Sequence, residues 1–434
     1  MDIERLYRVY LEHPLICTDS REVKPGSLFF ALKGGSFDGN RYAAEALRKG
    51  AFAAVVDDPS MEGMKDMIVM GDALLTLQRL AHLHRERTRI RVIAITGTNG
   101  KTTTKELIAA VLSAKYRTLF TRGNLNNHIG VPLTLLSIRD EEVAVIEMGA
   151  NHPGEIALLS DIADPDVGLI TNVGKAHLEG FGSFEGVMEA KGELYDFLAE
   201  KEVPALVNTS NPWLMKMAEK RGVERIPYAV GEGEGICGKV SSTVPWITCE
   251  VDTGMENLVI PTKLVGSYNL ENVLAAVAAG VFFKVPPGKI AGAISSYQPE
   301  NKRSQLITGR SNTLILDAYN ANPTSMMNAL EDFVASKDLP LMVILGDMLE
   351  LGAAAGEEHD RIVGWLKKQG GLKVCLVGPN FARAAAGMSD WNLFPDTTSC
   401  LAHLERERPG GYRILIKGSR KMSLEDTTKI LLDC

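Results

Sequence analysis

The sequence predicts an α/β protein built from three domains. Its 434 residues exceed what one domain ordinarily holds, so length alone favours two or three. Short apolar runs rich in Val and Ile alternate with helical patterns, which predicts mostly parallel sheets covered by helices. Glycine-rich polar loops follow several of these runs, and such loops bind ligands in α/β folds. We expect domains at residues 1–85, 86–300 and 301–434.

Composition narrows the class of protein. The chain is 45% hydrophobic and 23% charged, and its net charge of -7 argues against a nucleic-acid binder. Six scattered cysteines without a Cys-x-x-Cys pair indicate reduced thiols. The amino-terminal segment lacks the apolar core of a signal peptide, and no apolar run approaches the roughly 20 residues of a membrane span. These features predict a soluble cytoplasmic enzyme.

The first predicted domain is a small α/β unit. We expect a helix over Tyr42–Lys49 and a buried strand over Ala53–Val56. Ser20, Arg21 and Lys33 lie in polar loops beside predicted strands, where they could contact a phosphate or a uracil. Taken by themselves, the residues around Arg21 fit a plain polar turn before a strand better than a binding site.

A phosphate-binding loop is the clearest feature of the second domain. An apolar strand over Val92–Ile95 leads into a glycine turn, Lys101, three threonines and a helix predicted over Glu106–Leu112. In such loops backbone N–H groups and the helix dipole bind phosphates, the lysine neutralises them, and the hydroxyl of Thr102 would hold Mg²⁺. The spacing departs from G-x-x-x-x-G-K-[ST] because Ile95 occupies the first glycine position. An ordinary strand–helix turn with a chance Gly-Lys-Thr is the alternative.

Two further side chains stand at the ends of predicted strands. Glu147 ends an apolar strand and His177 follows the next one, which places both at the ligand-binding rim of a parallel sheet. Mg²⁺ prefers oxygen ligands, so Thr102 and Glu147 suit it directly. His177 is equally well a rim histidine without a metal. Lys191, on a predicted helix, would on spacing alone be a solvated lysine.

The end of the second domain predicts an antiparallel appendage. Gly231–Gly238 is expected to form an exposed hairpin loop, and Trp246–Val251 and Leu258–Leu264 are expected to be strands. Asn269 and Asn272 are three residues apart near the start of a predicted helix, so they share a face. Their amides could read the edge of a base, although Asn269 could instead cap the helix.

The third domain repeats the strand–helix alternation. Its predicted strands are Leu314–Ala318, Met342–Leu345, Val374–Val377 and Arg413–Ile416. Polar glycine-containing loops follow three of them and suggest a second binding surface on one sheet rim. Kinase signatures of His-Arg-Asp and Asp-Phe-Gly are absent from the sequence. The residues themselves therefore indicate phosphoryl transfer or ATP-driven ligation.

The motifs resemble those of the Mur ligase and folylpolyglutamate synthase superfamily over the whole chain. The resemblance rests on the loop Thr96–Thr103, on Glu147, on His177 and on Ala190-Lys-Gly-Glu193. Residues 124–136, 317–323, 345–352 and 416–420 look specifically like the Mur ligases that add D-alanyl-D-alanine. The Asp-Asn-Pro-Arg signature of the diaminopimelate-adding ligases is absent from the carboxy-terminal part. A diamino-acid-adding ligase and an inactive nucleotide-binding scaffold are the alternatives.

This resemblance implies a fold, a reaction and its partners. The domains would be a UDP-binding domain, a central ATP-binding domain and a Rossmann-like ligase domain. The enzyme, a monomer, would use ATP and Mg²⁺ to join UDP-MurNAc-tripeptide to D-Ala-D-Ala through an acyl phosphate. The third domain would close over ATP about a hinge near Gln298–Arg303.

The resemblance also implies roles for individual residues. Lys101, His177 and Lys191 would be catalytic. Thr102 and Glu147 would bind one Mg²⁺, and His177 with a carbamylated Lys191 would bind a second. The residues implied at ATP are Thr96, Gly97, Thr98, Asn99, Gly100, Lys101, Thr102, Thr103, Asn269, Asn272, Arg303, Asp317 and Asn320. Those implied at the UDP-substrate are Ser20, Arg21, Lys33, Asn126, Asn127 and Thr134.

Overall fold

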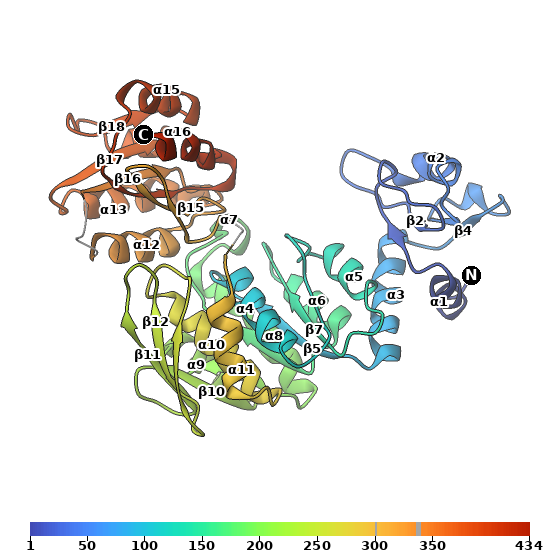
Figure 1. Cartoon of the computed structure of the whole chain (residues 1–434). Coiled ribbons are helices and arrows are strands. Elements are labelled where there is room, and N and C mark those ends of the chain that lie inside the picture. Colours follow the sequence, from blue (N-terminus) through green and yellow to red (C-terminus); the bar gives the residue numbers. More distant parts are fainter. Residues whose placement is uncertain (300–301, 336–339) are drawn as a thin grey trace.

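The fold is known from a computed structural model that describes residues 1–299, 302–335 and 340–434. These residues form three β-sheets, one in each predicted part of the chain (Figure 1). The carboxy-terminal sheet and its helices lie against one side of the central part, and the amino-terminal sheet stands at the other side. The expected hinge at Gln298–Arg303 includes residues 300–301, which lie outside the described residues. Its role stays a prediction.

The amino-terminal sheet has four parallel strands in the order β1-β2-β3-β4. The strand predicted over Ala53–Val56 is confirmed as β3, and the predicted helix is α2 with a 3-10 turn before it. The elements are α1 (Ile3–Glu12), β1 (Ile16–Cys17), β2 (Leu28–Phe30), η1 (Gly39–Tyr42), α2 (Ala43–Arg48), β3 (Ala53–Val56), η2 (Pro59–Met61) and β4 (Met67–Val69).

Helix α3 (Ala73–Thr88) joins this sheet to the central part of the chain (Figure 1). Asp72 starts the helix by accepting a hydrogen bond from the backbone N–H of Leu75 at 2.7 Å. Near its other end, buried Arg85 donates to Asp166 Oδ2 at 2.9 Å. One continuous apolar core runs from α1 and β2 through Leu77 to the central sheet. The amino-terminal domain is therefore packed onto the centre through this helix.

The central sheet contains nine strands among the described residues, in the order β13-β12-β11-β10-β9-β8-β5-β7-β6. Its strands from β6 to β11 are parallel, and β11, β12 and β13 pair antiparallel as predicted for the appendage. The strands are β5 (Arg91–Thr96), β6 (Thr118–Phe120), β7 (Val143–Glu147), β8 (Val167–Ile170), β9 (Ala205–Asn208), β10 (Arg225–Val230), β11 (Ile236–Ser242), β12 (Thr248–Asp252) and β13 (Asn257–Pro261).

Helices cover both faces of the central sheet. Alternate residues of β5 enter opposite cores, with Val92 and Ala94 in one and Ile93 and Ile95 in the other. The first core contains α3, α5, α6, α8 and α9, and the second contains α4, α10 and α11. The helices are α4 (Lys101–Ser113), α5 (Gly130–Leu135), α6 (Glu155–Ala163), α7 (Leu178–Phe181), α8 (Phe184–Glu200), α9 (Pro212–Arg221), α10 (Asn269–Phe282) and α11 (Pro287–Ser296).

The hairpin expected at Gly231–Gly238 is wrong. Strand β11 begins within that segment and pairs parallel, not antiparallel, with β10. Gly231 and Gly235 have positive φ angles of 80° and 77°, and a Cβ on Gly235 would lie 2.1 Å from the carbonyl oxygen of Pro227. These glycines let the chain loop back beside Pro227 and continue in its original direction.

The carboxy-terminal sheet has the strand order β14-β15-β19-β16-β17-β18, parallel except for β14. The four predicted strands are confirmed as β15, β16, β17 and β19, whereas the short edge strands β14 and β18 were not predicted. The elements are β14 (Gln305–Thr308), β15 (Thr313–Asp317), α12 (Pro323–Ala335), β16 (Leu341–Gly346), η3 (Gly352–Ala354), α13 (Ala355–Leu366), β17 (Leu372–Val377), α14 (Pro379–Ala384), β18 (Asn392–Phe394), α15 (Thr397–Glu407), β19 (Arg413–Lys417), η4 (Arg420–Met422), η5 (Leu424–Thr427) and α16 (Thr428–Asp433).

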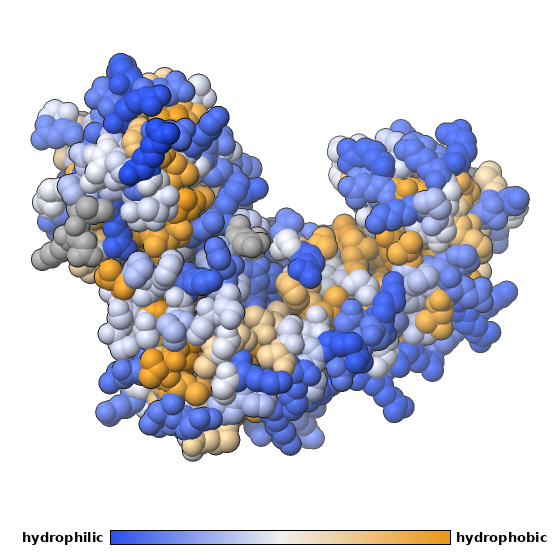
Figure 2. Space-filling model, in the orientation of Figure 1, coloured by the Kyte–Doolittle hydropathy of each residue, from blue (hydrophilic) through white to orange (hydrophobic). Residues whose placement is uncertain are grey.

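Hydrophilic residues cover most of the face shown in Figure 2, which is hollowed between the amino- and carboxy-terminal domains. Among the described helices, none combines the length and the apolar character required to cross a bilayer. All six cysteines are free thiols, and four of them are buried.

Candidate active site

A cavity of about 760 Å³ lies between the central and carboxy-terminal domains. The phosphate loop, the end of β7 and the start of α10 line it from one side, and loops after β15 and β16 line it from the other. Most of the residues predicted at ATP line this cavity. They are Thr98, Asn99, Gly100, Lys101, Thr102, Thr103, Asn269, Asn272, Arg303, Asp317 and Asn320.

The phosphate loop has the strand–turn–helix form that was predicted. Its helix, however, begins at Lys101 and not near Glu106. Gly100 precedes the helix in the left-handed conformation, with φ of 78°, and the threonines that follow are already helical. Threonine has a low helix propensity, which hid this first turn in the sequence.

Gly97 fixes the loop against the neighbouring strand. Its φ is 138°, and a Cβ there would lie 2.1 Å from Thr171 Oγ1. The hydroxyl of Thr171 donates to the carbonyl of Asn99 at 2.6 Å. Gly97 and the buried Thr96 thus support the loop from behind and do not line the cavity.

The ammonium of Lys101 folds back onto its own loop. It donates to the carbonyl oxygens of Gly97 at 2.7 Å and Thr98 at 3.0 Å. Burial lowers the pKa of Lys101 to about 8, and the carboxylate of Glu147 opposes that shift. Within the described residues, the hydrogen bonds of this half-buried ammonium go to neutral carbonyls, so it is well suited to pair with an incoming phosphate.

Thr102 and Glu147 are brought together as predicted. The hydroxyl of Thr102 donates to Glu147 Oε2 at 3.0 Å, and Asn126 donates to Glu147 Oε1 at 2.9 Å. Two neighbouring ligands of octahedral Mg²⁺, each at about 2.05 Å from the ion, lie about 2.9 Å apart. The separation of the Thr102 and Glu147 oxygens fits such a pair.

The rest of a Mg²⁺ shell would come from a ligand. In the described part of the chain, no group of three or more His, Cys, Asp or Glu side chains is arranged to hold a metal. Mg²⁺ commonly takes one or two protein oxygens together with phosphate oxygens and water. The residues present therefore fit an ion that binds with a nucleotide.

His177 and Lys191 lie around a shared aromatic ring. The Phe181 ring centroid is 6.5 Å from that of His177 and 5.4 Å from Lys191 Nζ. His177 lines the cavity, whereas Lys191 is buried on α8 behind it. Burial, and to a smaller extent the charge of Lys101, lower the pKa of Lys191 to about 7. Lys191 is thus not the solvated lysine that helical spacing alone favoured.

Asn269 and Asn272 form a chain of amides at the start of α10. Asn269 donates to the carbonyl of Val265 at 2.7 Å and accepts from Asn272 at 2.8 Å. The Asn272 oxygen accepts from the hydroxyl of Thr104 on α4 at 2.9 Å. Asn269 does not cap the helix through its side chain, so the capping alternative is wrong.

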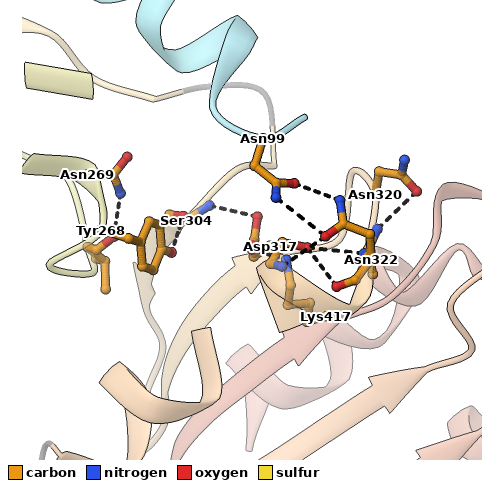
Figure 3. Close-up of polar contacts among 11 residues, drawn as sticks. Asn99, Tyr268, Asn269, Ser304, Asp317, Asn320, Asn322 and Lys417 are labelled. Carbon is orange, nitrogen blue, oxygen red and sulfur yellow. Dashed lines mark hydrogen bonds and ion pairs between the residues drawn. The ribbon is translucent and has the colours of Figure 1, made fainter. Parts of the chain in front are cut away.

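The carboxy-terminal domain completes the site through a polar cluster (Figure 3). Asp317 forms a short ion pair with Lys417 and accepts from the backbone N–H of Ser304 at 3.3 Å. Asn99 of the phosphate loop and Asn322 exchange amide hydrogen bonds, the shorter 2.7 Å long. The two domains thus meet directly at the phosphate loop.

Two further predicted residues face this cluster. The Arg303 guanidinium lies 3.9 Å from the centre of the Tyr319 ring, and both residues line the cavity. Asn320 also lines the cavity, and its side-chain oxygen accepts from the backbone N–H of Ala321 at 2.9 Å (Figure 3).

The residues predicted at the UDP-substrate are not brought together. Ser20, Arg21 and Lys33 lie in the amino-terminal domain, where Arg21 pairs with Asp19 and Lys33 with Asp57.

The other three belong to the central domain. Asn126 and Asn127 line the cavity, and Asn127 accepts from the backbone N–H groups of Ile129 and Gly130 before α5. Thr134 is buried and donates to the carbonyl of Gly130, away from the cavity.

Several residues at the site were not predicted. Lys105 is 1% exposed, and its ammonium lies 3.8 Å from Glu147 Oε2 and 3.6 Å from Glu106 Oε1. It stands one helical turn after Lys101, a spacing visible in the sequence once the helix is known to start there. Asn322 and Glu350 act across the domain interface, which no local pattern could reveal.

Comparison with known proteins agrees with this geometry. Residues 14–93 match the family model "Mur ligase family, catalytic domain", residues 95–280 the "Mur ligase middle domain", and residues 302–420 the "Mur ligase, glutamate ligase domain". The UDP-N-acetylmuramoyl-tripeptide–D-alanyl-D-alanine ligase of Escherichia coli strain K12 is 35% identical, over 96% of this chain and 93% of the relative.

Solved structures are similar over the same length. MurF from Acinetobacter baumannii has a TM-score of 0.89 and 32% identity, covering 96% of this chain and 93% of that one. MurF from Thermotoga maritima, solved in complex with ADP, has a TM-score of 0.86 and 26% identity, covering 97% of each chain. The chain therefore belongs to the Mur ligase family, in the branch represented by these MurF proteins.

Proposed function

We propose that the protein joins D-Ala-D-Ala to UDP-MurNAc-tripeptide with hydrolysis of ATP to ADP and phosphate. The observation that carries this proposal is the phosphate loop, with Lys101 and Thr102 beside Glu147 in a cavity closed by the third domain. The relatives named as D-Ala-D-Ala-adding ligases share this architecture over nearly the whole chain. A reaction on such nucleotide-linked precursors would take place in the cytoplasm.

The reaction begins at the carboxylate of the tripeptide. A carboxylate is a poor electrophile, so one of its oxygens attacks the γ-phosphorus of ATP, forming an acyl phosphate and releasing ADP. The amine of D-Ala-D-Ala then attacks the acyl carbon, the amide bond forms, and phosphate leaves as the nitrogen loses a proton. Lys101 would turn from its loop carbonyls to the phosphates and stabilise their developing charge.

The bound metal would act through charge. Mg²⁺ would neutralise the repulsion between the attacking carboxylate and the triphosphate. Thr102 and Glu147 would hold one ion, and His177 with Lys191 a second. An unmodified ammonium would repel that second ion, so Lys191 would be carbamylated. Its pKa of about 7 supplies the neutral amine that carbamylation requires.

The amino-terminal domain would bind the UDP end of the substrate. Ser20, Arg21 and Lys33 lie in its polar loops, and Asn126 and Asn127 line the cavity that contains the phosphate loop. For Lys33 to contact a ligand, it would exchange its ion pair with Asp57 for the ligand's phosphates. We keep residues 1–85, 86–300 and 301–434 as the working domains, although position 85 falls inside α3.

The test is ADP release with each acceptor in turn. UDP-MurNAc-dipeptide and UDP-MurNAc-tripeptides ending in lysine or diaminopimelate are paired with D-Ala-D-Ala or with a free diamino acid. We expect turnover only for a tripeptide with D-Ala-D-Ala, and none for the Lys101→Met variant. Turnover with the dipeptide and a diamino acid, and none with D-Ala-D-Ala, would overturn the proposal.

A further inference from the structure

We propose that Glu350, contributed by the carboxy-terminal domain, is a positioning residue that orients His177 for metal binding. The inference rests on the proposed function, which makes His177 a ligand of the second Mg²⁺. Because Glu350 and His177 lie on different domains, Glu350 could affect the metal only while the two domains are in contact.

The contact between the two side chains is close and lies at the site. His177 Nδ1 is 2.9 Å from Glu350 Oε2. Both residues line the cavity between the domains, His177 in the loop before α7 and Glu350 in the loop after β16. The hydrogen bond with His177 lowers the pKa of Glu350, and burial opposes that shift.

The backbone supports a functional role for this pair. His177 and Glu350 both adopt the left-handed conformation, with φ of 49° and 65°. Non-glycine residues seldom occupy that region, and such strain collects where a side chain must point in one direction. Here both strained residues turn their side chains toward each other across the interface.

The chemistry of the imidazole completes the argument. A carboxylate that accepts a hydrogen bond from Nδ1–H fixes the ring tautomer and leaves the lone pair of Nε2 for a metal. Within the described residues, no hydrogen bond engages His177 Nε2, and the ring meets Phe181 edge-on. Lys191, the other ligand proposed for the same ion, contacts that same phenyl ring.

Domain docking and metal binding are then linked. If the carboxy-terminal domain moves away from the centre, as the hinge prediction requires, Glu350 would leave His177 and the imidazole ring could rotate. Return of the domain with ATP in the cavity would fix the orientation of the ring again. The second ion would therefore bind firmly only in the docked form, after the nucleotide.

The test counts bound Mn²⁺, a magnetic substitute for Mg²⁺. Full-length protein in bicarbonate buffer is titrated with Mn²⁺ at saturating β,γ-methylene-ATP, and free Mn²⁺ is followed by electron paramagnetic resonance. We expect two sites in the unaltered protein and, in Glu350→Ala, a second site weakened about 10- to 100-fold with the first unchanged. Glu350→Gln should retain part of the affinity because its amide oxygen still accepts from Nδ1–H.

A matched control separates ring orientation from docking in general. Lys175, two residues before His177, crosses the same interface and pairs with buried Glu358 at 2.7 Å. Lys175→Ala removes one interdomain ion pair and leaves His177 and Glu350 intact. We expect it to keep the second Mn²⁺ site within about threefold of the unaltered protein.

Each contrary result has a distinct meaning. Two unchanged Mn²⁺ sites in Glu350→Ala would overturn the role of Glu350 and leave the proposed function standing. An equal loss of affinity at the second Mn²⁺ site in Glu350→Ala and Lys175→Ala would also overturn this role. Any weakening of the contact between the domains would then be enough to weaken the second site. Failure of the unaltered protein to bind the nucleotide analogue would instead overturn the proposed function itself.

Discussion

The buried amine of Lys191 leads to a quantitative prediction about carbamylation. Only the neutral amine reacts with CO₂, giving a carbamate and a proton. Burial lowers the pKa of Lys191 from its ordinary value of 10.5 to about 7. At pH 7.5 such a group is about three-quarters neutral, whereas a lysine at its ordinary pKa is only about 0.1% neutral. Lys191 therefore presents roughly 700 times more reactive amine than an exposed lysine.

The direction of the pH dependence follows from the lowered pKa. Above about pH 7 the neutral amine predominates and the carbamate can form. As the pH falls through about 7, the amine takes up a proton and the carbamate is lost. Exposed lysines would need a pH about 3.5 units higher to reach the same state.

Carbon-13 NMR in labelled bicarbonate measures this directly. We expect one carbamate signal that persists down to about pH 7 and disappears in Lys191→Met.

Lys101→Met is the matched control because it removes another lysine of the same site. It should keep a Lys191 signal, shifted to somewhat higher pH because the Lys101 charge that lowers the Lys191 pKa is removed. A spectrum identical in the unaltered protein and in Lys191→Met, across pH 6.5 to 9, would refute the reasoning.

Four single substitutions test the phosphate loop and the carboxy-terminal loop that contacts it. Lys101→Met should weaken ATP binding at least tenfold in calorimetry, because the loop would lose its only charge toward the phosphates; unchanged affinity would contradict its role. Gly97→Ala should cost at least about 2 kcal/mol in thermal unfolding and abolish ATP binding, since its Cβ would meet Thr171 Oγ1 at 2.1 Å. Asn322→Ala and Asn99→Ala should each raise the Kd for ATP about fivefold, and the double variant should be no worse than either, because they lose one shared contact worth about 1 kcal/mol. Additive losses would show that the contact is not shared.

Local pattern was enough to predict the strands that matter for the site. The runs ending at Ile95 and Glu147 are buried on both faces, so they read as continuous apolar segments in the sequence. Their ends then placed Thr102 and Glu147 at one rim, and the structure brings their oxygens to 3.0 Å. Short edge strands such as β18 carry too few apolar residues to give a comparable signal.

Contacts between distant segments could not be predicted. The meeting of Asn99 with Asn322, 223 positions later, depends on how two folded domains dock. The burial of Lys191 likewise depends on how helices pack around α8. Helical spacing alone predicted that this side chain would be exposed to solvent. Resemblance to a known family implied a role for Lys191, and that role stays a prediction, whereas the burial of its amine became visible only in three dimensions.

Helix α3 has a consequence for which substrates fit. One end of the helix packs against α1 and β2, and near the other end Arg85 forms an ion pair with Asp166. The helix therefore fixes the distance between the amino-terminal domain and the phosphate loop of the central domain. A peptide lengthens by about 3.3 to 3.6 Å with each added residue. A nucleotide anchored in the amino-terminal domain and carrying a peptide one residue too short would stop that far from the phosphate loop. Under the proposed function, the fixed position of α3 would therefore make the enzyme select substrates by the length of their peptide.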